Sequence, residues 1–287
     1  MRPDTGRVPV IRGFAASVVV VVLALVGSVS ASALPGGDAP GRLAFGGEQR
    51  TYLVHVPPGP PTGLVLNLHG AGMNGAAQMA ATGYDAVADQ HGFVVAYPDG
   101  IDFSWADGRG ASVPDQRGVD DVGYLVALVD QLTAQYGIPR GRVFATGMSA
   151  GAFMATRLGC QRADVFAAIA PVAGTLASGY PCSPAQPVSV LQTHGSVDPV
   201  VPFTGGPMVG RGGSSDVVAA PAMAQRWRTV DGCPPPVTQQ GPGVLRYTAA
   251  GCAEGTEVTF VQIDGGGHVW PGDASQAIGR FFAAHGR

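Results

Sequence analysis

The sequence contains no lysine, since all seventeen of its basic residues are arginines. That absence excludes three kinds of chemistry that need a lysine amine: Schiff-base formation, a serine–lysine dyad, and phosphate binding by a P-loop lysine. Charged residues are sparse, making up 13% of the 287 residues and giving a net charge of −3. A chain without a basic excess is not expected to bind nucleic acid or an anionic membrane.

The N-terminal segment has the pattern of a secretory signal peptide. Three arginines precede an unbroken apolar run over residues 14–29, and an Ala-Ser-Ala pattern ends at Ala33. We therefore expect a signal peptide over residues 1–33 and a secreted protein. The alternative is an uncleaved anchor, since the run approaches the length needed to cross a bilayer. The small residues favour cleavage, which leaves no stable membrane anchor.

Cleavage after Ala33 would leave a mature chain of about 254 residues, enough for one large α/β domain. Without Arg2, Arg7, Arg12 and Asp4 it carries 14 arginines against 19 acidic residues, a net charge of −5.

The sequence has only four cysteines, and an exported protein with an even number is expected to form disulfides. Cys233 and Cys252 bracket a stretch rich in proline and glycine, which favours a local bond between them. Cys160 would then pair with Cys182, although the other two pairings remain open. None of the four lies in a turn typical of a catalytic cysteine, so a structural role is expected.

Short apolar runs alternate with helix-like segments along the chain. The expected strands cover residues 51–56, 64–68, 93–97, 143–146, 167–172, 188–193 and 258–263. The expected helices cover residues 76–90, 121–136, 150–158, 216–230 and 274–284. This alternation predicts an α/β fold with a mostly parallel central sheet and helices on both faces.

The domain organisation is simple, because the sequence shows neither an internal repeat nor an interdomain linker. A stretch rich in glycine and proline over residues 34–48 is expected to be a short flexible N-terminus, and residues 49–287 a single domain. Three long loops stand out, at residues 98–120, 199–215 and 231–256. Loops of this length are usually functional or disordered.

The segment Gly147-Met148-Ser149-Ala150-Gly151 lies between an expected strand and an expected helix. This is the pattern of a nucleophile elbow, in which a sharp turn exposes a serine hydroxyl and small neighbours are required. The pattern predicts Ser149 as the nucleophile. The N–H of Ala150, at the start of the helix, is expected to stabilise an oxyanion.

A serine nucleophile needs a base and an acid that orients the base, each after a later strand. Asp198 follows the strand at 188–193, and His268 follows the strand at 258–263 through three glycines. We therefore predict Asp198 as the orienting acid and His268 as the base.

The remaining histidines and acids have structural interpretations. His55, His91, His194 and His285 fit structural or solvated roles, Asp264 is too near His268 in sequence, and Asp120 and Asp121 fit a helix cap. A metal site made of His69, His194 and His268 lacks the paired spacing of zinc motifs, so no metal is predicted.

The second oxyanion donor is expected in the turn Leu68-His69-Gly70-Ala71-Gly72. Such a turn presents unencumbered N–H groups, and glycine lets a substrate approach closely. Ala71 is the first choice as donor and Gly70 the neighbouring alternative, while His69 is expected to brace the loop. The structural alternative is a glycine-rich turn with no catalytic part.

Five motifs in order resemble the polyhydroxybutyrate depolymerase-type esterases, a family that also contains secreted feruloyl and acetylxylan esterases (carbohydrate esterase family 1). The motifs are Leu68-His69-Gly70; Ala96-Tyr97-Pro98-Asp99-Gly100 with Trp105; Gly147-Met148-Ser149-Ala150-Gly151; His194-Gly195-Ser196-Val197-Asp198 with Val201-Pro202-Phe203; and Gly266-Gly267-His268-Val269-Trp270-Pro271-Gly272. The resemblance covers nearly all of the mature chain. It implies an α/β-hydrolase fold over residues 49–287, a secreted ester hydrolase, no cofactor, and a triad of Ser149, Asp198 and His268.

The sequence departs from this family in two ways. Secreted depolymerases of the family usually add a linker and a polymer-binding domain, whereas this sequence ends 19 residues after His268. In addition, Ala71 stands where many relatives carry a cysteine, so one family disulfide is expected to be absent.

These features predict two-step hydrolysis of a carboxylic ester through an acyl-enzyme. Feruloyl or acetyl esters of plant polysaccharides are the first choice of substrate, and 3-hydroxyalkanoate polyesters are the alternative. An acyltransferase and a non-catalytic wall-binding protein are further alternatives. Trp105 and Trp270 are candidate walls for the substrate, although packing of a loop against the body accounts for them equally well.

Overall fold

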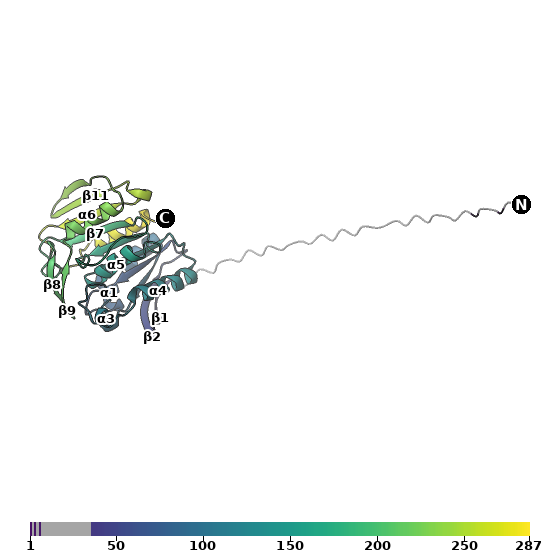
Figure 1. Cartoon of the computed structure of the whole chain (residues 1–287), viewed down its shortest axis with the longest axis horizontal. Helices are drawn as coiled ribbons and strands as arrows, with labels where there is room; N and C mark the ends of the chain where they lie inside the picture. The colour runs from purple at the N-terminus through teal and green to yellow at the C-terminus, as the bar shows by residue number, and fades with distance from the viewer. Residues whose placement is uncertain (2, 4–5, 7–35) are drawn as a thin grey trace. The chain divides into compact units, whose positions relative to one another are not determined.

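A ten-stranded β-sheet forms the centre of the computed structural model, which describes residues 1, 3, 6 and 36–287 (Figure 1). The strands follow the order β1-β2-β4-β3-β5-β6-β7-β12-β11-β10. Their bounds are β1 Gly37–Phe45, β2 Glu48–Val56, β3 Gly63–Leu68, β4 Phe93–Pro98, β5 Val143–Met148, β6 Ala168–Val172, β7 Ser189–Gly195, β10 Val237–Gly241, β11 Val244–Ala249 and β12 Val258–Ile263. The predicted signal peptide lies outside the described residues, apart from residues 1, 3 and 6.

The six central strands, from β4 to β12 in the sheet order, pair in parallel. Antiparallel strands complete both edges, with β1 and β2 beside β4 and with β10 and β11 beside β12. Strands β3 and β4 are buried along their whole length, which explains their nearly continuous apolar sequences, with Asn67 the one polar side chain of β3. The predicted α/β fold with a mostly parallel sheet is confirmed.

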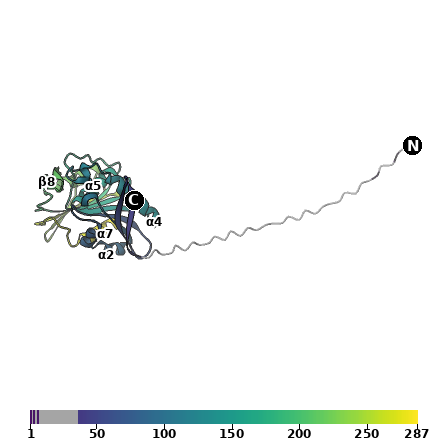
Figure 2. The same ribbon diagram turned by 90° about the horizontal axis from the view of Figure 1, so that it is seen from below.

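Helices cover both faces of this sheet (Figure 2). Their bounds are α1 Gly75–Thr82, α2 Tyr84–His91, α3 Val113–Gln116, α4 Asp121–Tyr136, α5 Ala150–Gln161, α6 Ala220–Val230 and α7 Ala274–Ala284. Side chains of α4, α5 and α6 share one core with Leu64 and Leu66 of β3. Side chains of α2 and α7 share a second core with Val65 of the same strand, because successive residues of a strand point to opposite faces.

The predicted elements of the sheet are all present. The seven predicted strands end within three residues of the observed ones, and the predicted helices at residues 121–136 and 274–284 match α4 and α7. The helix predicted at 76–90 is instead two helices, because Gly83 adopts a left-handed conformation (φ 53°) that ends α1. The helix predicted at 216–230 begins only at Ala220.

The N-terminal stretch expected to be flexible contains strand β1, so that part of the prediction is wrong. β1 pairs with β2 in a hairpin whose two-residue turn is Gly46-Gly47, with φ values of 60° and 81°. Positive φ at both positions is what a tight hairpin turn needs, and glycine supplies it. The stretch rich in glycine is therefore a hairpin signal here.

The three long loops also contain regular structure. The first holds the short helices η1 (Ile101–Phe103) and α3. The second holds the hairpin of β8 (Gly206–Gly210) and β9 (Gly213–Val217), which explains the late start of α6. The third holds β10, β11 and η2 (Ala253–Gly255), and its two strands extend the sheet.

Two disulfides join Cys160 to Cys182 and Cys233 to Cys252, the pairing that the sequence favoured. The first ties the end of α5 to the segment before β7, and the second closes the excursion that carries β10 and β11. Among the described residues, no helix has both the length and the apolar character needed to cross a membrane.

Candidate active site

The segment predicted as a nucleophile elbow forms a sharp turn between β5 and α5. Ser149 has φ 55° and ψ −117°, a backbone conformation that is rare outside glycine. Flanking glycines permit it: a Cβ on Gly147 would lie 2.5 Å from the carbonyl oxygen of Leu68, and one on Gly151 would lie 2.0 Å from it. Such strain is typical of functional sites. The turn leaves the Ser149 side chain half-buried at the carboxyl end of β5.

Asp198 and His268 lie together at the same edge of the sheet. Asp198 follows β7 and His268 follows β12, and these two strands are adjacent and parallel. The Nδ1 of His268 lies 2.8 Å from Oδ2 of Asp198. The other carboxylate oxygen accepts the N–H groups of Val200 at 2.8 Å and Val201 at 2.9 Å. The carboxylate is therefore fixed on both sides and aimed at the imidazole.

The Asp198 carboxyl is held in its ionised form. Burial alone would raise its pKa, but the hydrogen bond from His268 and those from the two backbone amides outweigh burial and hold the pKa below the usual value. An ionised carboxylate requires a proton on the nitrogen that faces it. Nδ1 of His268 therefore donates, and Nε2 is left free to accept a proton.

Ser149 and His268 both lie next to the end of β6. The N–H of Ser149 donates to the carbonyl of Val172 at 3.0 Å. A small pocket lined by Val172 is also lined by Gly267 and Val269, the two neighbours of His268. No hydrogen bond joins the Ser149 hydroxyl to His268 in the described part of the chain. Such bonds commonly form only when a substrate is bound.

His194, a neighbour of the Asp198 loop, has a structural place. Its Nε2 lies 3.0 Å from the carbonyl oxygen of Val201 and 3.6 Å from the Asp198 carboxylate. Burial lowers the pKa of His194, which favours the neutral ring. A neutral ring that donates to the Val201 carbonyl supports the loop that holds Asp198.

The predicted oxyanion loop lies against the serine turn. A Cβ on Gly70 would lie 3.6 Å from the Cβ of Ser149. The N–H of Gly72 donates to the carbonyl of Phe103 at 2.8 Å, so that group is already in use. Ala71 is exposed between these glycines. The N–H of Ala150 is the first of helix α5 and has no acceptor within the helix.

His69 braces this loop through both ring nitrogens. Its Nε2 accepts the N–H of Gly100 at 2.9 Å, and its Nδ1 lies 2.9 Å from the carbonyl oxygen of Gly70. Burial lowers the pKa of His69, which favours a neutral ring with the proton on Nδ1. Gly100 is required here, because a Cβ on it would lie 2.0 Å from the carbonyl oxygen of Ser104.

The two tryptophans predicted as substrate walls have different positions. Trp105 is fully buried, and its indole N–H donates to the carbonyl of His69 at 2.9 Å. It supports the oxyanion loop from below, so its predicted role as a wall is wrong. Trp270 is half-buried, and its indole N–H donates to the hydroxyl of Ser275. The exposed aromatic near the loop is Phe103, which sequence reasoning did not single out.

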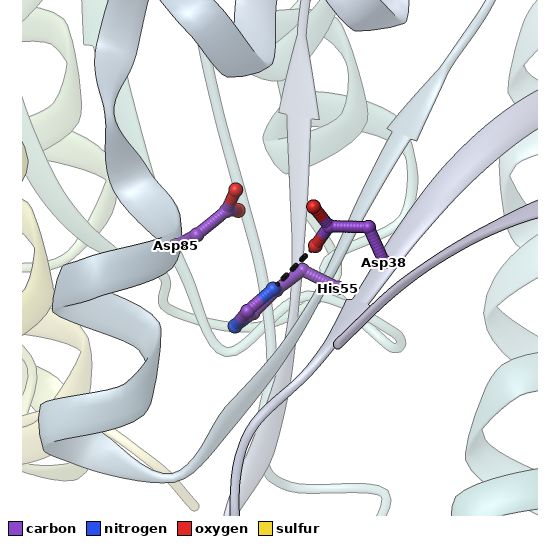
Figure 3. Close-up of side chains that lie close together, drawn as sticks. All are labelled: Asp38, His55 and Asp85. Atoms are coloured by element: carbon purple, nitrogen blue, oxygen red, sulfur yellow. Dashed lines mark hydrogen bonds and ion pairs between the residues drawn. The ribbon is translucent and has the colours of Figure 1, made fainter. Parts of the chain in front are cut away.

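A cluster away from the triad residues is the one group of three potential metal ligands among the described residues (Figure 3). It consists of Asp38 on β1, His55 on β2 and Asp85 on α2. However, His55 Nδ1 lies 2.7 Å from Asp38, and its Nε2 lies 2.9 Å from Asp89. Carboxylates on both ring nitrogens favour an imidazolium, which has no lone pair for a metal. His55 therefore forms ion pairs with Asp38 and Asp89, and these pairs attach β1 to β2 and α2.

Comparison with known proteins identifies the family. Residues 50–227 match the family described as Esterase PHB depolymerase. Feruloyl esterase B of Piromyces equi is 31% identical over 211 residues, which cover 71% of this chain and 39% of that protein. Poly(3-hydroxyalkanoate) depolymerase C of Paucimonas lemoignei is 35% identical over 147 residues, covering 48% of this chain and 33% of that protein. The chain thus spans less than half the length of these two relatives.

A solved structure supports the fold assignment. The acetyl xylan esterase from Aspergillus awamori superposes with a TM-score of 0.61 at 18% identity, covering 85% of this chain and 98% of that one. Identity at this level shows the fold alone, which is that of α/β-hydrolase esterases. The family match, which extends over more than half of the chain, carries the assignment: this protein belongs to the esterase PHB depolymerase family and is a carboxylic ester hydrolase.

Proposed function

We propose that the protein is a secreted serine esterase that uses Ser149 as nucleophile, His268 as base and Asp198 as the acid that orients the base. The hydrogen bond of 2.8 Å between His268 and Asp198, at the sheet edge that also carries the strained Ser149 turn, is the observation that carries this proposal. Three side chains from three separate strand ends then meet the requirements of nucleophilic catalysis.

In the first step, Nε2 of His268 accepts the hydroxyl proton of Ser149 while Oγ bonds to the ester carbonyl carbon. The ionised Asp198 stabilises the imidazolium that forms. The imidazolium then gives its proton to the leaving alcohol as the carbon–oxygen bond of the ester breaks, and an acyl-enzyme remains. In the second step, a water molecule gives a proton to His268, attacks the acyl carbon and releases the acid. Ser149 regains its proton.

The negative charge on the carbonyl oxygen needs two donors. The N–H of Ala150 supplies one, because it begins α5 and benefits from the helix dipole. The N–H of Ala71 supplies the other, since its neighbour Gly72 already donates to Phe103. Gly70 is the alternative donor, and its close approach to Ser149 supports a place for this loop beside the reacting carbon.

Feruloyl or acetyl esters of plant polysaccharides are the proposed substrates, since the relatives include a feruloyl esterase and a structural neighbour is an acetyl xylan esterase. Esters of 3-hydroxyalkanoates are the second candidate, favoured by the depolymerase relative. Secretion is supported by the signal-peptide pattern over residues 1–33 and by the two disulfides, which form and persist in oxidising compartments.

The test is hydrolysis of p-nitrophenyl acetate by the wild type and by Ser149→Ala. The variant is expected to lose activity by at least about a thousandfold while its circular dichroism spectrum stays unchanged. Ser183→Ala, an exposed serine on a surface segment, is the matched control and should keep full activity. Retained activity in Ser149→Ala, or no labelling of the wild type by a fluorophosphonate probe, would contradict the proposal. Comparing methyl ferulate, acetylated xylan and 3-hydroxybutyrate oligomers then ranks the substrates.

A further inference from the structure

Two distant segments meet at Gly72, the last residue of the oxyanion loop: Phe103 through its main-chain carbonyl and Arg211 through its side chain. The carbonyl of Phe103 accepts the Gly72 N–H at 2.8 Å. From the other direction, Nη1 of Arg211 lies so close that a Cβ on Gly72 would be 2.9 Å from it. Arg211 connects β8 to β9. The hairpin of the second long loop therefore reaches the loop that borders the nucleophile.

Phe103 is held out to solvent by a strained backbone. Asp102 and Phe103 both have positive φ, at 51° and 54°, which non-glycine residues rarely adopt in succession. The Phe103 side chain is 52% exposed. The ring lies in a strained turn beside the oxyanion loop, and contact with a bound apolar group would remove its apolar surface from water. Trp105, only two residues later, is buried and supports the loop instead.

Arg211 is an exposed cation without a paired carboxylate in the described part of the chain. The main chain beside Arg211 is nevertheless anchored through its neighbour Gly212. The Gly212 N–H donates to the carbonyl of Ala111 at 3.0 Å, and its carbonyl accepts the side chain of Gln116 at 2.6 Å. The base of the hairpin packs through Met208 and Val217 on Phe153 of α5, one turn after the elbow. The backbone at the tip of the hairpin is thus anchored, and it carries a guanidinium that has no ion-pair partner among the described residues.

The distance between the Arg211 guanidinium and Ser149 is short enough for one substrate molecule to reach both. Gly70 approaches Ser149, because a Cβ added to Gly70 would lie 3.6 Å from the Ser149 Cβ, and Gly72 is two residues further along. From the length of two residues of chain, the guanidinium lies within about 17 Å of the Ser149 Cβ. An acyl or alcohol group of moderate length can span this gap from the scissile ester.

We propose that Phe103 and Arg211 form a substrate subsite beside the oxyanion loop, which binds an apolar group that ends in a carboxylate. Phe103 provides an apolar wall, and the planar guanidinium of Arg211 provides two parallel donors for a carboxylate. This inference rests on the proposed esterase function and adds the charge of its substrate: esters with a free acid are preferred to neutral esters of the same length.

The test compares matched acidic and neutral esters. On the acyl side, p-nitrophenyl monoesters of dicarboxylic acids with four to ten carbons are compared with p-nitrophenyl alkanoates of equal length. On the alcohol side, the butyrate of 4-hydroxybenzoic acid is compared with the butyrate of its methyl ester. The enzymes are the wild type, Arg211→Gln, Phe103→Ala, and Arg246→Gln, a control on the distant strand β11.

Arg211→Gln should raise KM for the acidic esters about five- to tenfold, most strongly at one chain length, and leave KM for the neutral esters and kcat unchanged. Added salt should raise the wild-type KM for the acids in the same way. Phe103→Ala should lower kcat/KM about tenfold for both members of a pair. Arg246→Gln should change neither.

An equal effect of Arg211→Gln on acidic and neutral esters, in both series, would overturn the inference while leaving the esterase function intact. An unchanged kcat/KM in Phe103→Ala would overturn the apolar wall. If the wild type cleaves neither the acidic nor the neutral esters, the proposed function itself fails, and the subsite fails with it. Hydrolysis of neutral esters by the wild type separates these cases.

Discussion

The Nδ1 of His268 lies 2.8 Å from Oδ2 of Asp198, although the two residues are 70 positions apart in the chain. Parallel pairing of β7 with β12 produces this contact, because it aligns Gly195 with Ile263 and brings the two following loops together. A Cβ on Gly195 would lie 2.2 Å from the carbonyl oxygen of Gly266, so the loops pack backbone to backbone. The pair is therefore set by sheet register and by glycines.

Asp198→Asn is expected to lower kcat/KM by about 10³- to 10⁴-fold, because an amide no longer requires the proton on Nδ1 of His268 and stabilises the imidazolium less well. Steady-state hydrolysis of p-nitrophenyl acetate measures this effect, and thermal unfolding checks the fold. Asp264→Asn, an exposed acid in the same loop as His268, is the matched control and should change the rate less than about twofold. Equal losses in the two variants would remove Asp198 from the mechanism.

Gly151→Ala is expected to abolish activity and to destabilise the protein by about 2 to 4 kcal/mol, because the new methyl group would lie 2.0 Å from the Leu68 carbonyl oxygen. Either the end of β3 or the start of α5 has to move, and the proposed oxyanion donors lie in the loop that follows β3 and at the start of α5. Urea denaturation measures the stability, and fluorophosphonate labelling measures the competence of Ser149. Gly179→Ala, where a Cβ meets nothing within 4 Å, should alter neither. A stable and active Gly151→Ala protein would be incompatible with the close approach.

Trp105→Phe is expected to reduce activity, although Trp105 is buried and does not contact the substrate. The change removes the indole N–H that donates to the buried His69 carbonyl, at a cost of about 1 to 2 kcal/mol of stability. Because His69 holds the oxyanion loop, kcat should fall while KM stays nearly constant. Steady-state kinetics and the midpoint of thermal unfolding measure the two effects. A rise in KM with unchanged kcat would instead indicate that Trp105 contacts the substrate.

Much of the site could be predicted because its residues sit at strand ends. Ser149, Asp198 and His268 each follow an apolar run that reads clearly as a buried strand, and parallel strands bring such ends together. The glycines at 147 and 151 could be predicted for the same reason, since a strand-to-helix turn leaves no room for side chains. Each of these residues is recognised from its local sequence, and the parallel sheet then brings them to the same edge.

What the sequence could not reveal depends on contacts between distant segments. Trp105 and Phe103 are both aromatic residues in one loop, and only the packing against His69 decides that the first is buried and the second exposed. From sequence, Arg211 is simply one residue of a long loop. Its place beside the oxyanion loop depends on the pairing of β8 with β9 and on the contact of Gly212 with Ala111, which sequence does not show. The single sequence signal was the run of glycines around Arg211, which is typical of a tight hairpin.

His55 lies between the carboxylates of Asp38 and Asp89, and this arrangement predicts a pH-dependent attachment of strand β1. Figure 3 shows the contact with Asp38. Burial alone would lower the pKa of His55, but the two hydrogen-bonded carboxylates outweigh burial and raise it. Stability from this group is therefore fully present below the unfolded pKa of about 6.5 and is lost as the pH rises through the raised folded value. The gain should be about 1 kcal/mol, since both carboxylates are partly exposed.

His55→Gln should lose this stability at pH 5.5 and match the wild type more closely at pH 9. Thermal unfolding at both values measures the difference, and hydrogen exchange of the β1 amides locates it. His91→Gln is the control, since the pKa of His91 is lowered by burial and that ring has no carboxylate partner in the described residues. A wild-type advantage that stays constant across this pH range would contradict the ion pairs of His55.

The buried Asp231 is also expected to make the protein less stable as the pH rises, but for a different reason than His55. Its carboxyl group is fully buried at the end of α6, and burial raises its pKa to about 7 against the offsetting Val188 N–H and Arg287 charge. Because its pKa is higher in the folded protein than in the unfolded chain, the Asp231 carboxyl contributes to the free energy of unfolding below about pH 4. This contribution is lost as the pH rises through 7, since the unfolded chain ionises more readily. Asp231→Asn cannot ionise and can still accept the Val188 N–H.

Urea denaturation should therefore show the Asp231→Asn variant about 2 kcal/mol more stable than the wild type at pH 8.5 and no more stable at pH 4.5. Asp130→Asn, which changes an exposed acid on α4, is the control and should have the same stability as the wild type at both pH values. An Asp231→Asn protein that is less stable than the wild type at both pH values would rule out a buried, mostly protonated carboxyl.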